Sequence, residues 1–115
     1  MDIDFLRNYC LSFPGATEEI QWETHLLFKV GGKMFTMCGS TAESQISLKA
    51  NPEKFDELIE IEGVIPAPYL ARNKWIAIQT RNSLKISELK ELIKESYDLV
   101  FEKLPKKVRN EITAK

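Results

Sequence analysis

Two side chains of this sequence could form a nucleophile and its base, namely His25, the single histidine, and Cys38, one of two cysteines. An imidazole beside a thiol can remove its proton and leave a reactive thiolate. A hairpin with a two-residue loop at Gly31-Gly32 would place His25 opposite Cys38, on the face away from the core. The dyad would also need an orienting group and an oxyanion site, and the sequence shows neither. Packing is therefore favoured for both residues, and we predict a protein that is not an enzyme.

Metal and cofactor chemistry have little support in the sequence. Four acids between residues 56 and 62 have the spacing of a solvated helix face, whereas a metal site needs converging oxygen ligands. Gly31-Gly32 lacks the longer glycine pattern of a phosphate-binding loop. Cys10 and Cys38 are far apart and form no Cys-x-x-Cys motif. We expect no metal, no cofactor and two reduced, buried thiols.

The charges are divided unequally along the chain. Residues 1–62 carry 11 acids and 5 bases, a net charge of −6, whereas residues 63–115 carry 6 acids and 11 bases, a net charge of +5, which together give −1. A positive face can therefore exist on a slightly acidic protein of pI about 5.9. The alternative is that these cations are solvated or pair with the acidic half.

The segment 66–75 reads Pro-Ala-Pro-Tyr-Leu-Ala-Arg-Asn-Lys-Trp and joins two prolines to two aromatic residues and two cations. Each proline fixes its own φ and pushes the preceding residue toward extended geometry, so the segment cannot be a regular helix. We predict a constrained loop that leads into a strand at 75–79, with Trp75 half in the core. Loops of this kind often carry binding groups. The candidate contact residues are Tyr69, Asn73 and Trp75.

Apolar periodicity gives the elements that must position these groups. Alternation predicts strands at 18–22, 26–30, 33–38, 45–49 and 75–79. Helical spacing and capping residues predict helices at 2–13, at 52–63 behind an Asn51 cap, and at 87–104. Pro105 ends the last helix and leaves a basic tail that frays or forms one short turn.

Within the predicted hairpin, the two-residue loop pairs Phe28 with Phe35 and Leu26 with Met37, and these four side chains form the core side. Helices at both ends and antiparallel strands between them predict an α+β two-layer sandwich with the helices packed on one sheet face. The other face stays partly open and could serve as a docking surface.

Length and composition set the remaining limits. The 115 residues, 43% hydrophobic and 29% charged, are typical of one globular domain spanning residues 1–115. No apolar run reaches the roughly 20 residues that span a bilayer, so we expect no membrane partner. The first residues lack the basic region and apolar stretch of a secretory signal. We expect a cytoplasmic protein.

Several short segments together resemble the MmcQ/YjbR family. The segments are 13–19, 27–35, 46–49, 66–75, 96–97 and 103–107. They occur in the family's order across most of the chain. The resemblance implies a compact CyaY-like (bacterial frataxin-like) α/β domain and a double-wing DNA-binding role, and it implies no known enzyme.

One segment departs from the family pattern. Relatives are expected to carry Gly-Tyr-His-Met-Asn before the tryptophan, whereas this chain has Ala67-Pro68-Tyr69-Leu70-Ala71 and lacks the histidine. A role of that histidine therefore cannot be transferred to this chain. The family features that remain are Tyr69, the two following cations and Trp75.

Two functional hypotheses follow. The first is a non-enzymatic DNA-binding protein that grips phosphates with Lys29, Lys33, Lys49, Arg72, Lys74 and Arg81. The second is a module that binds a small molecule or another protein through the Tyr69–Trp75 loop and the open sheet face. Clustering of the cations on one face would favour the first, whereas an apolar pocket with few polar groups would favour the second.

Overall fold

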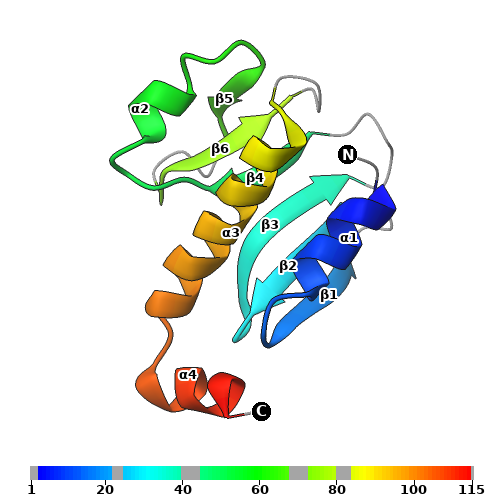
Figure 1. Cartoon of the computed structure of the whole chain (residues 1–115), viewed down its shortest axis with the longest axis vertical. Helices are drawn as coiled ribbons and strands as arrows, with labels where there is room; N and C mark the ends of the chain where they lie inside the picture. The colour runs from blue at the N-terminus through cyan, green and yellow to red at the C-terminus, as the bar shows by residue number, and fades with distance from the viewer. Residues whose placement is uncertain (1–2, 22–24, 40–44, 68–72, 80–83, 115) are drawn as a thin grey trace.

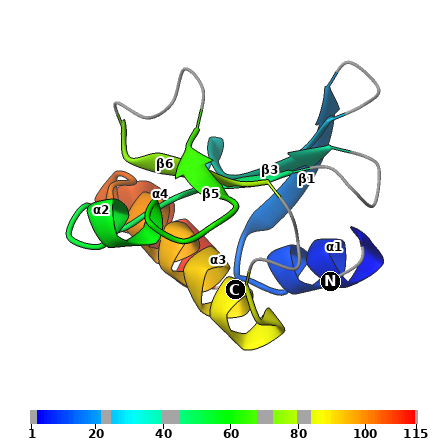
Figure 2. The same cartoon turned by 90° about the horizontal axis from the view of Figure 1, so that it is seen from above.

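The computed structural model describes residues 3–21, 25–39, 45–67, 73–79 and 84–114, which form two layers. One layer is a six-stranded antiparallel sheet in the order β1-β2-β3-β4-β6-β5 (Figure 1). Its strands are β1 (Ala16–Gln21), β2 (His25–Val30), β3 (Lys33–Gly39), β4 (Ile46–Lys49), β5 (Val64–Pro66) and β6 (Trp75–Ile78). The helices are α1 (Ile3–Leu11), α2 (Phe55–Leu58), α3 (Ile86–Glu102) and α4 (Lys106–Thr113). Figure 2 shows α1 and α3 on the same side of the sheet, which confirms the predicted α+β sandwich.

The turn between β2 and β3 has the predicted geometry. Gly31 and Gly32 have φ values of 57° and 81°, which a two-residue hairpin turn requires and which glycine adopts without a steric penalty. Val30 therefore lies opposite Lys33. The register predicted at this end of the hairpin is confirmed.

A bulge further along the hairpin changes the rest of the register. The pairing shifts by one residue between Phe28 and its neighbour, so that Phe28 lies opposite Thr36 and not opposite Phe35. Phe35 is the extra residue of β3. Both Phe35 and Thr36 are fully buried. The predicted Phe28–Phe35 pair was therefore wrong, although both rings do enter the core.

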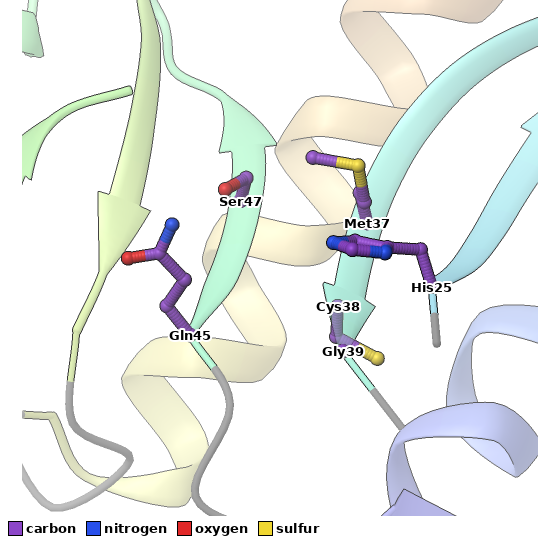
Figure 3. A pocket seen from close by; sticks show the side chains of 6 residues that line it. All are labelled: His25, Met37, Cys38, Gly39, Gln45 and Ser47. Atoms are coloured by element: carbon purple, nitrogen blue, oxygen red, sulfur yellow. The ribbon is translucent and has the colours of Figure 1, made fainter. Parts of the chain in front are cut away.

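The same shift removes the predicted Cys/His pair. Leu26 lies opposite Cys38 where Met37 was expected, and His25 lies opposite Gly39. Cys38 is only 1% exposed and belongs to the core cluster, whereas Figure 3 shows His25 beside Met37 on the other side of β3. The predicted position of His25 opposite Cys38 and the predicted core position of Met37 were both wrong for one physical reason, the extra residue in β3.

A buried serine closes the gap that the bulge leaves. The ladder between β3 and β4 ends at the Thr36–Leu48 pair, beyond which the backbone groups of Phe35 and Lys49 need other partners. The Ser96 hydroxyl of α3 donates to the Phe35 carbonyl oxygen at 2.5 Å and accepts from the Lys49 N–H at 3.0 Å. Ser96 is 0% exposed. One side chain therefore joins α3 to both strands.

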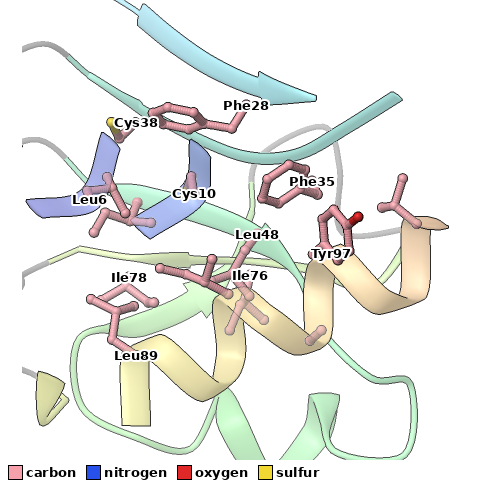
Figure 4. Packing of buried hydrophobic residues seen from close by; sticks show 14 of the residues in the cluster. Leu6, Cys10, Phe28, Phe35, Cys38, Leu48, Ile76, Ile78, Leu89 and Tyr97 are labelled. Carbon is pink, nitrogen blue, oxygen red and sulfur yellow. The ribbon is translucent and has the colours of Figure 1, made fainter. Parts of the chain in front are cut away.

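The main core lies between the sheet and helices α1 and α3 (Figure 4). Every second residue of a strand faces it, and both helices contribute an apolar stripe. Fully buried members from the strands and helices include Phe28, Leu48, Ile76, Leu89 and Ile93. The predicted burial of Cys10 and Cys38 outside any disulfide is confirmed.

Aromatic rings fasten α3 to the loop after α1. The ring of Tyr97 stacks on Phe13 with centroids 4.8 Å apart and meets Phe35 edge to face at 5.4 Å. Its hydroxyl donates to the Pro14 carbonyl oxygen at 2.5 Å. The apolar ring is thus packed while its polar tip finds an acceptor, as buried tyrosines usually require.

The region after β4 differs from its prediction. Asn51 does not cap a helix that begins at Pro52, because its side-chain oxygen accepts the Glu53 N–H at 2.9 Å and closes a turn. The helix is reduced to α2 at residues 55–58. Gly63, with φ of 87°, instead leads into the unpredicted strand β5, which pairs with β6.

The segment after Pro105 forms a further helix, α4, and not a frayed tail or a single turn. Its apolar side packs against the turn between β2 and β3 and against the turn between α1 and β1. A Cβ atom placed on Gly31 would lie 3.2 Å from Val108 Cγ1, and one on Gly15 would lie 2.9 Å from Ile112 Cγ2. Tertiary contacts therefore order a basic segment whose composition alone suggested a frayed, solvent-exposed tail. None of the helices in the described part of the chain is long and apolar enough to cross a membrane.

Candidate functional site

A pocket of about 370 Å³ lies where β3 begins and β4 ends, beside the corner between α3 and α4. We call it the lysine pocket, and it is lined by Lys33, Met34, Lys49, Asn73, Trp75, Val100, Lys103, Leu104 and Pro105. The antiparallel sheet brings these residues together because the start of β3, the end of β4 and the start of β6 lie at the same end of the sheet. The pocket thus joins residues far apart in sequence.

The floor of the lysine pocket is apolar. Trp75 lies opposite Lys49 across the β4–β6 ladder and is 6% exposed. It packs with Ala67 and Ala77 into a small second core on the open face of the sheet, against which Met34 is half-buried. Trp75 is therefore part of the floor of the pocket and not an exposed platform. It is more buried than the predicted position, half in the core, implied.

Lys49 is the most buried of the three lysines in the pocket. It is half-buried, whereas Lys33 and Lys103 are exposed. Burial lowers the pKa of the Lys49 ammonium, and the positive charge of Lys103 lowers this pKa further. Both causes disfavour the charged form, because the pocket offers it poor solvation and a like charge.

The rim of the pocket carries cations without acids. Lys103 is the C-terminal cap of α3, where the free carbonyl groups give the helix end a partial negative charge that favours ammonium groups. Lys33 follows the hairpin turn at the start of β3 and lines the same pocket. The described lining of the pocket contains no carboxylate. An anion is therefore the complementary ligand for this rim.

The structure brings together only part of the predicted phosphate-gripping set. Lys33 and Lys49 meet in the lysine pocket, with Asn73 and Trp75 beside them. Lys29 lies apart, because its ammonium pairs with the Glu19 carboxylate and lowers the pKa of that acid.

Lys74 also points elsewhere. Its φ of 63° is left-handed, which is uncommon for a residue with a side chain, and its Nζ lies 4.9 Å from the ring centroid of Phe55. Three further predicted site residues, Tyr69, Arg72 and Arg81, lie outside the described residues. The predicted cations therefore do not form one continuous surface within the described residues.

Lys103 is the site residue that sequence reasoning left out. Its cluster with Lys106, Lys107 and Arg109 was visible as a basic segment, but nothing local connects it with Lys49. The connection is tertiary, since α3 crosses the sheet and ends above the start of β3 and the end of β4. A basic residue two positions before a helix-ending proline is the only local signal, and it is a weak one.

Other chemistry has less support among the described residues. They contain no group of three or more His, Cys, Asp or Glu side chains that could hold a metal ion. Burial raises the pKa of the Cys10 thiol to about 12, so it is protonated and unreactive near neutral pH. A smaller pocket of about 200 Å³ is lined by His25, Met37, Cys38, Gly39, Gln45 and Ser47 and contains no carboxylate, lysine or arginine among the described residues.

The sequence between residues 11 and 99 matches the family model YjbR. The chain belongs to the YjbR family. The matched range holds both strands of the hairpin, β4, β6 and most of α3, and therefore Lys33, Lys49 and Trp75 of the lysine pocket. It ends before Lys103. The predicted resemblance to the MmcQ/YjbR family is confirmed.

Two solved structures share the YjbR fold seen here. Protein DR2400 of Deinococcus radiodurans, assigned to the domain family DUF419, matches with a TM-score of 0.87 and 27% identity, over 97% of this chain and 88% of that one. A protein from Pseudomonas syringae matches with a TM-score of 0.72 and 21% identity, over 87% of this chain and 99% of that one. No curated protein matches the chain.

Proposed function

We propose that this YjbR protein is a non-enzymatic binding protein whose lysine pocket holds a small anionic ligand with a flat apolar body. One observation carries the proposal, namely that Lys33, Lys49 and Lys103 meet on the rim of a pocket with an apolar floor. Small-molecule sites are commonly concave, mostly apolar and equipped with a few polar groups. This is the small-molecule form of the second hypothesis drawn from the sequence.

The positive charges on the rim of the lysine pocket favour binding of an anion. Two ammonium groups about 4 Å apart repel by roughly 1 kcal/mol in water and about 4 kcal/mol at an effective dielectric constant of 20. No acid of the described lining offsets this repulsion in the lysine pocket. A carboxylate, sulfonate or phosphate between Lys49 and Lys103 would replace a repulsive pair by two attractive ones. Its apolar body would then cover Met34 and Trp75.

The test uses 8-anilino-1-naphthalenesulfonate, an aromatic anion whose fluorescence rises in apolar surroundings. We expect saturable binding that weakens with salt, and a dissociation constant about tenfold higher, a loss of roughly 1.4 kcal/mol, in Lys49→Gln/Lys103→Gln. The matched control is Lys90→Gln/Lys107→Gln, which removes the same charge outside the pocket. Equal affinity in the two double variants would refute the pocket as the binding site.

DNA binding is the second candidate, and the continuation of positive charge beyond the pocket favours it. Lys106 and Lys107 directly follow Pro105 and are exposed on α4. Together with Lys33 and Lys103 they could follow a phosphate backbone. The acidic pI of about 5.9 opposes this candidate, because nucleic-acid-binding domains are more often basic overall.

Fluorescence anisotropy of a labelled generic duplex at low and moderate salt separates the two candidates. Binding that falls with salt and with Lys106→Ala/Lys107→Ala would support the DNA candidate. Arg72→Ala/Lys74→Ala tests the loop predicted from the sequence in the same assay. Absence of binding at low salt would refute the DNA candidate and leave the small-anion site as the remaining proposal.

A further inference from the structure

We propose that the lysine pocket selects a phosphate monoester, whose doubly charged head is held by Lys33, Lys49 and Lys103 while its flat organic part covers the apolar floor. The inference rests on the proposed function, because the same pocket must bind an anion. It goes further by naming the chemical class of that anion and its charge. Singly charged anions of the same shape should bind more weakly.

The charged side chains in the described lining of the pocket are all positive. They belong to Lys33, Lys49 and Lys103, and the remaining lining residues are Met34, Asn73, Trp75, Val100, Leu104 and Pro105. A ligand with one negative charge leaves two of the three positive charges uncompensated, whereas a ligand with two negative charges leaves one. Because like charges repel more strongly where solvent is scarce, the pocket favours the doubly charged ligand.

The three lysines reach the pocket from three different elements. Lys33 begins β3, Lys49 ends β4 and Lys103 is the C-terminal cap of α3. The end of β4 is joined to α3, because the Lys49 N–H donates to the Ser96 hydroxyl at 3.0 Å. A phosphate monoester presents three acceptor oxygens around one phosphorus atom, so each oxygen can accept from a different ammonium group. A carboxylate presents only two.

Lys49 is the lysine whose charged form gains most from such a ligand. It is half-buried, and burial followed by the positive charge of Lys103 lowers its pKa. Both effects act against the ammonium form of Lys49. A dianion beside Lys49 acts in the opposite direction and raises this pKa, so the bound ligand and the charged Lys49 stabilise each other.

The same reasoning separates this ligand class from the backbone of a nucleic acid. Each backbone phosphate is a diester that carries a single charge. A phosphate monoester carries about 1.5 to 2 negative charges at pH 7, because its second pKa is about 6. The lysine pocket should therefore prefer a small monoester to a diester with the same organic part.

The volume and the floor of the pocket restrict the organic part of the ligand. A volume of about 370 Å³ lies near the lower end of the range for small-molecule sites. Met34 and Trp75 provide the apolar floor, and Asn73 in the same lining carries an amide that can donate or accept a hydrogen bond. A phosphate ester of a small aromatic alcohol meets these conditions.

The test compares three naphthalene compounds by isothermal titration calorimetry. At pH 8, 1-naphthyl phosphate carries two charges, whereas naphthalene-1-sulfonate and the diester methyl 1-naphthyl phosphate carry one each. We expect the monoester to bind about tenfold more tightly than either singly charged probe. At pH 5 the monoester carries mainly one charge, so its advantage over the sulfonate should narrow to about twofold.

Lys33→Gln tests whether the third lysine provides the preference for two charges. Its matched control is Lys94→Gln, which removes the same charge from an exposed position of α3 outside the pocket. We expect the preference for the monoester at pH 8 to fall to about threefold in Lys33→Gln and to stay about tenfold in the control. Lys103→Gln should lower the preference in the same way, which provides a second variant if Lys33→Gln disturbs the hairpin turn.

The outcomes separate this inference from the proposed function. If the three probes bind equally at pH 8 and all bind more weakly to Lys49→Gln/Lys103→Gln, the phosphate class is refuted and the anion site stands. If no probe binds better to the wild type than to that double variant, both proposals fail. A preference for the monoester that survives at pH 5, or that Lys33→Gln and Lys103→Gln leave unchanged, would also overturn the inference. A preference that narrows at pH 5 and in these two variants, but not in Lys94→Gln, supports it.

Discussion

Ser96 offers the sharpest test of how the bulge in β3 is held. Ser96→Ala removes one hydroxyl that donates to the Phe35 carbonyl and accepts from the Lys49 N–H, at 2.5 Å and 3.0 Å. The alanine methyl group fits the space, so the change adds no clash. The variant therefore isolates two hydrogen bonds at a site that is 0% exposed.

The expected loss follows from the groups left behind. A buried donor or acceptor without a partner costs about 1–3 kcal/mol, so Ser96→Ala should lower the free energy of unfolding by about 2–4 kcal/mol. That is a large part of the roughly 5–15 kcal/mol that small domains possess. The matched control is Ser12→Ala, which removes an exposed hydroxyl that donates to the Tyr9 carbonyl at 2.6 Å, and we expect a change within about 0.5 kcal/mol.

Urea unfolding followed by circular dichroism measures both variants. The midpoint should fall for Ser96→Ala with little change in slope, because the same surface is exposed on unfolding. The same variant should also weaken binding of the aromatic anion, since Ser96 positions the backbone of Lys49. A loss in Ser96→Ala no larger than in Ser12→Ala would show that the bulge does not depend on this hydroxyl.

Three further predictions concern the contacts around the core. Tyr97→Phe should lower the free energy of unfolding by about 1 kcal/mol in urea, because the ring contacts stay and only the hydrogen bond to the Pro14 carbonyl is lost; an unchanged midpoint would contradict this. Gly31→Ala should lower the free energy of unfolding by about 1–3 kcal/mol, because Gly31 has a φ of 57° and lies close to Leu104. In a double-mutant cycle, Leu104→Ala should make Gly31→Ala less destabilising, whereas strictly additive losses would rule out the contact. For Cys10, the folded protein keeps the thiol protonated up to about pH 12 while the unfolded chain releases the proton near its ordinary pKa of 9.0, so the free energy of unfolding should fall as pH rises between these values, and Cys10→Ala should remove that part of the fall.

Periodicity predicted the sheet well because it follows from burial. In β2, β4 and β6, successive side chains lie in turn on the helical layer and on the open face, and those of β3 do so on either side of its bulge. The two-glycine turn was equally local, since φ values of 57° and 81° select glycine whatever lies nearby. Such features need no knowledge of distant residues.

The bulge could not be predicted in the same way. Phe35 is the extra residue of β3, and its carbonyl group accepts a hydrogen bond from the hydroxyl of Ser96, 61 residues away. The reach of α4 has a similar origin, because its apolar residues lie against turns that the sequence places far from it. Asn51 shows a different failure, since an Asx turn and a helix cap use the same residue types and the following contacts decide between them.

The candidate site likewise combines residues that local patterns predicted with others that only the tertiary structure identifies. Lys33, Lys49, Asn73 and Trp75 were named from local patterns, and the fold brings them into one pocket. Lys29 was named for the same reasons, but it pairs with Glu19 on the neighbouring strand. Charge and exposure identify cations that could bind, whereas only the tertiary structure determines which cations lack an acid nearby.

The bulge connects the fold with the site. Met34 and Met37 are three residues apart, so strict alternation would put them on opposite faces of β3. The extra residue between them lets both lie on the open face, where Met34 packs beside Trp75 and helps to floor the lysine pocket. The hydroxyl of Ser96 that holds this irregularity also holds the backbone of Lys49, 47 residues away. The floor of the pocket and the position of its most buried lysine therefore depend on the same buried serine, which explains why we expect one substitution to affect both stability and binding.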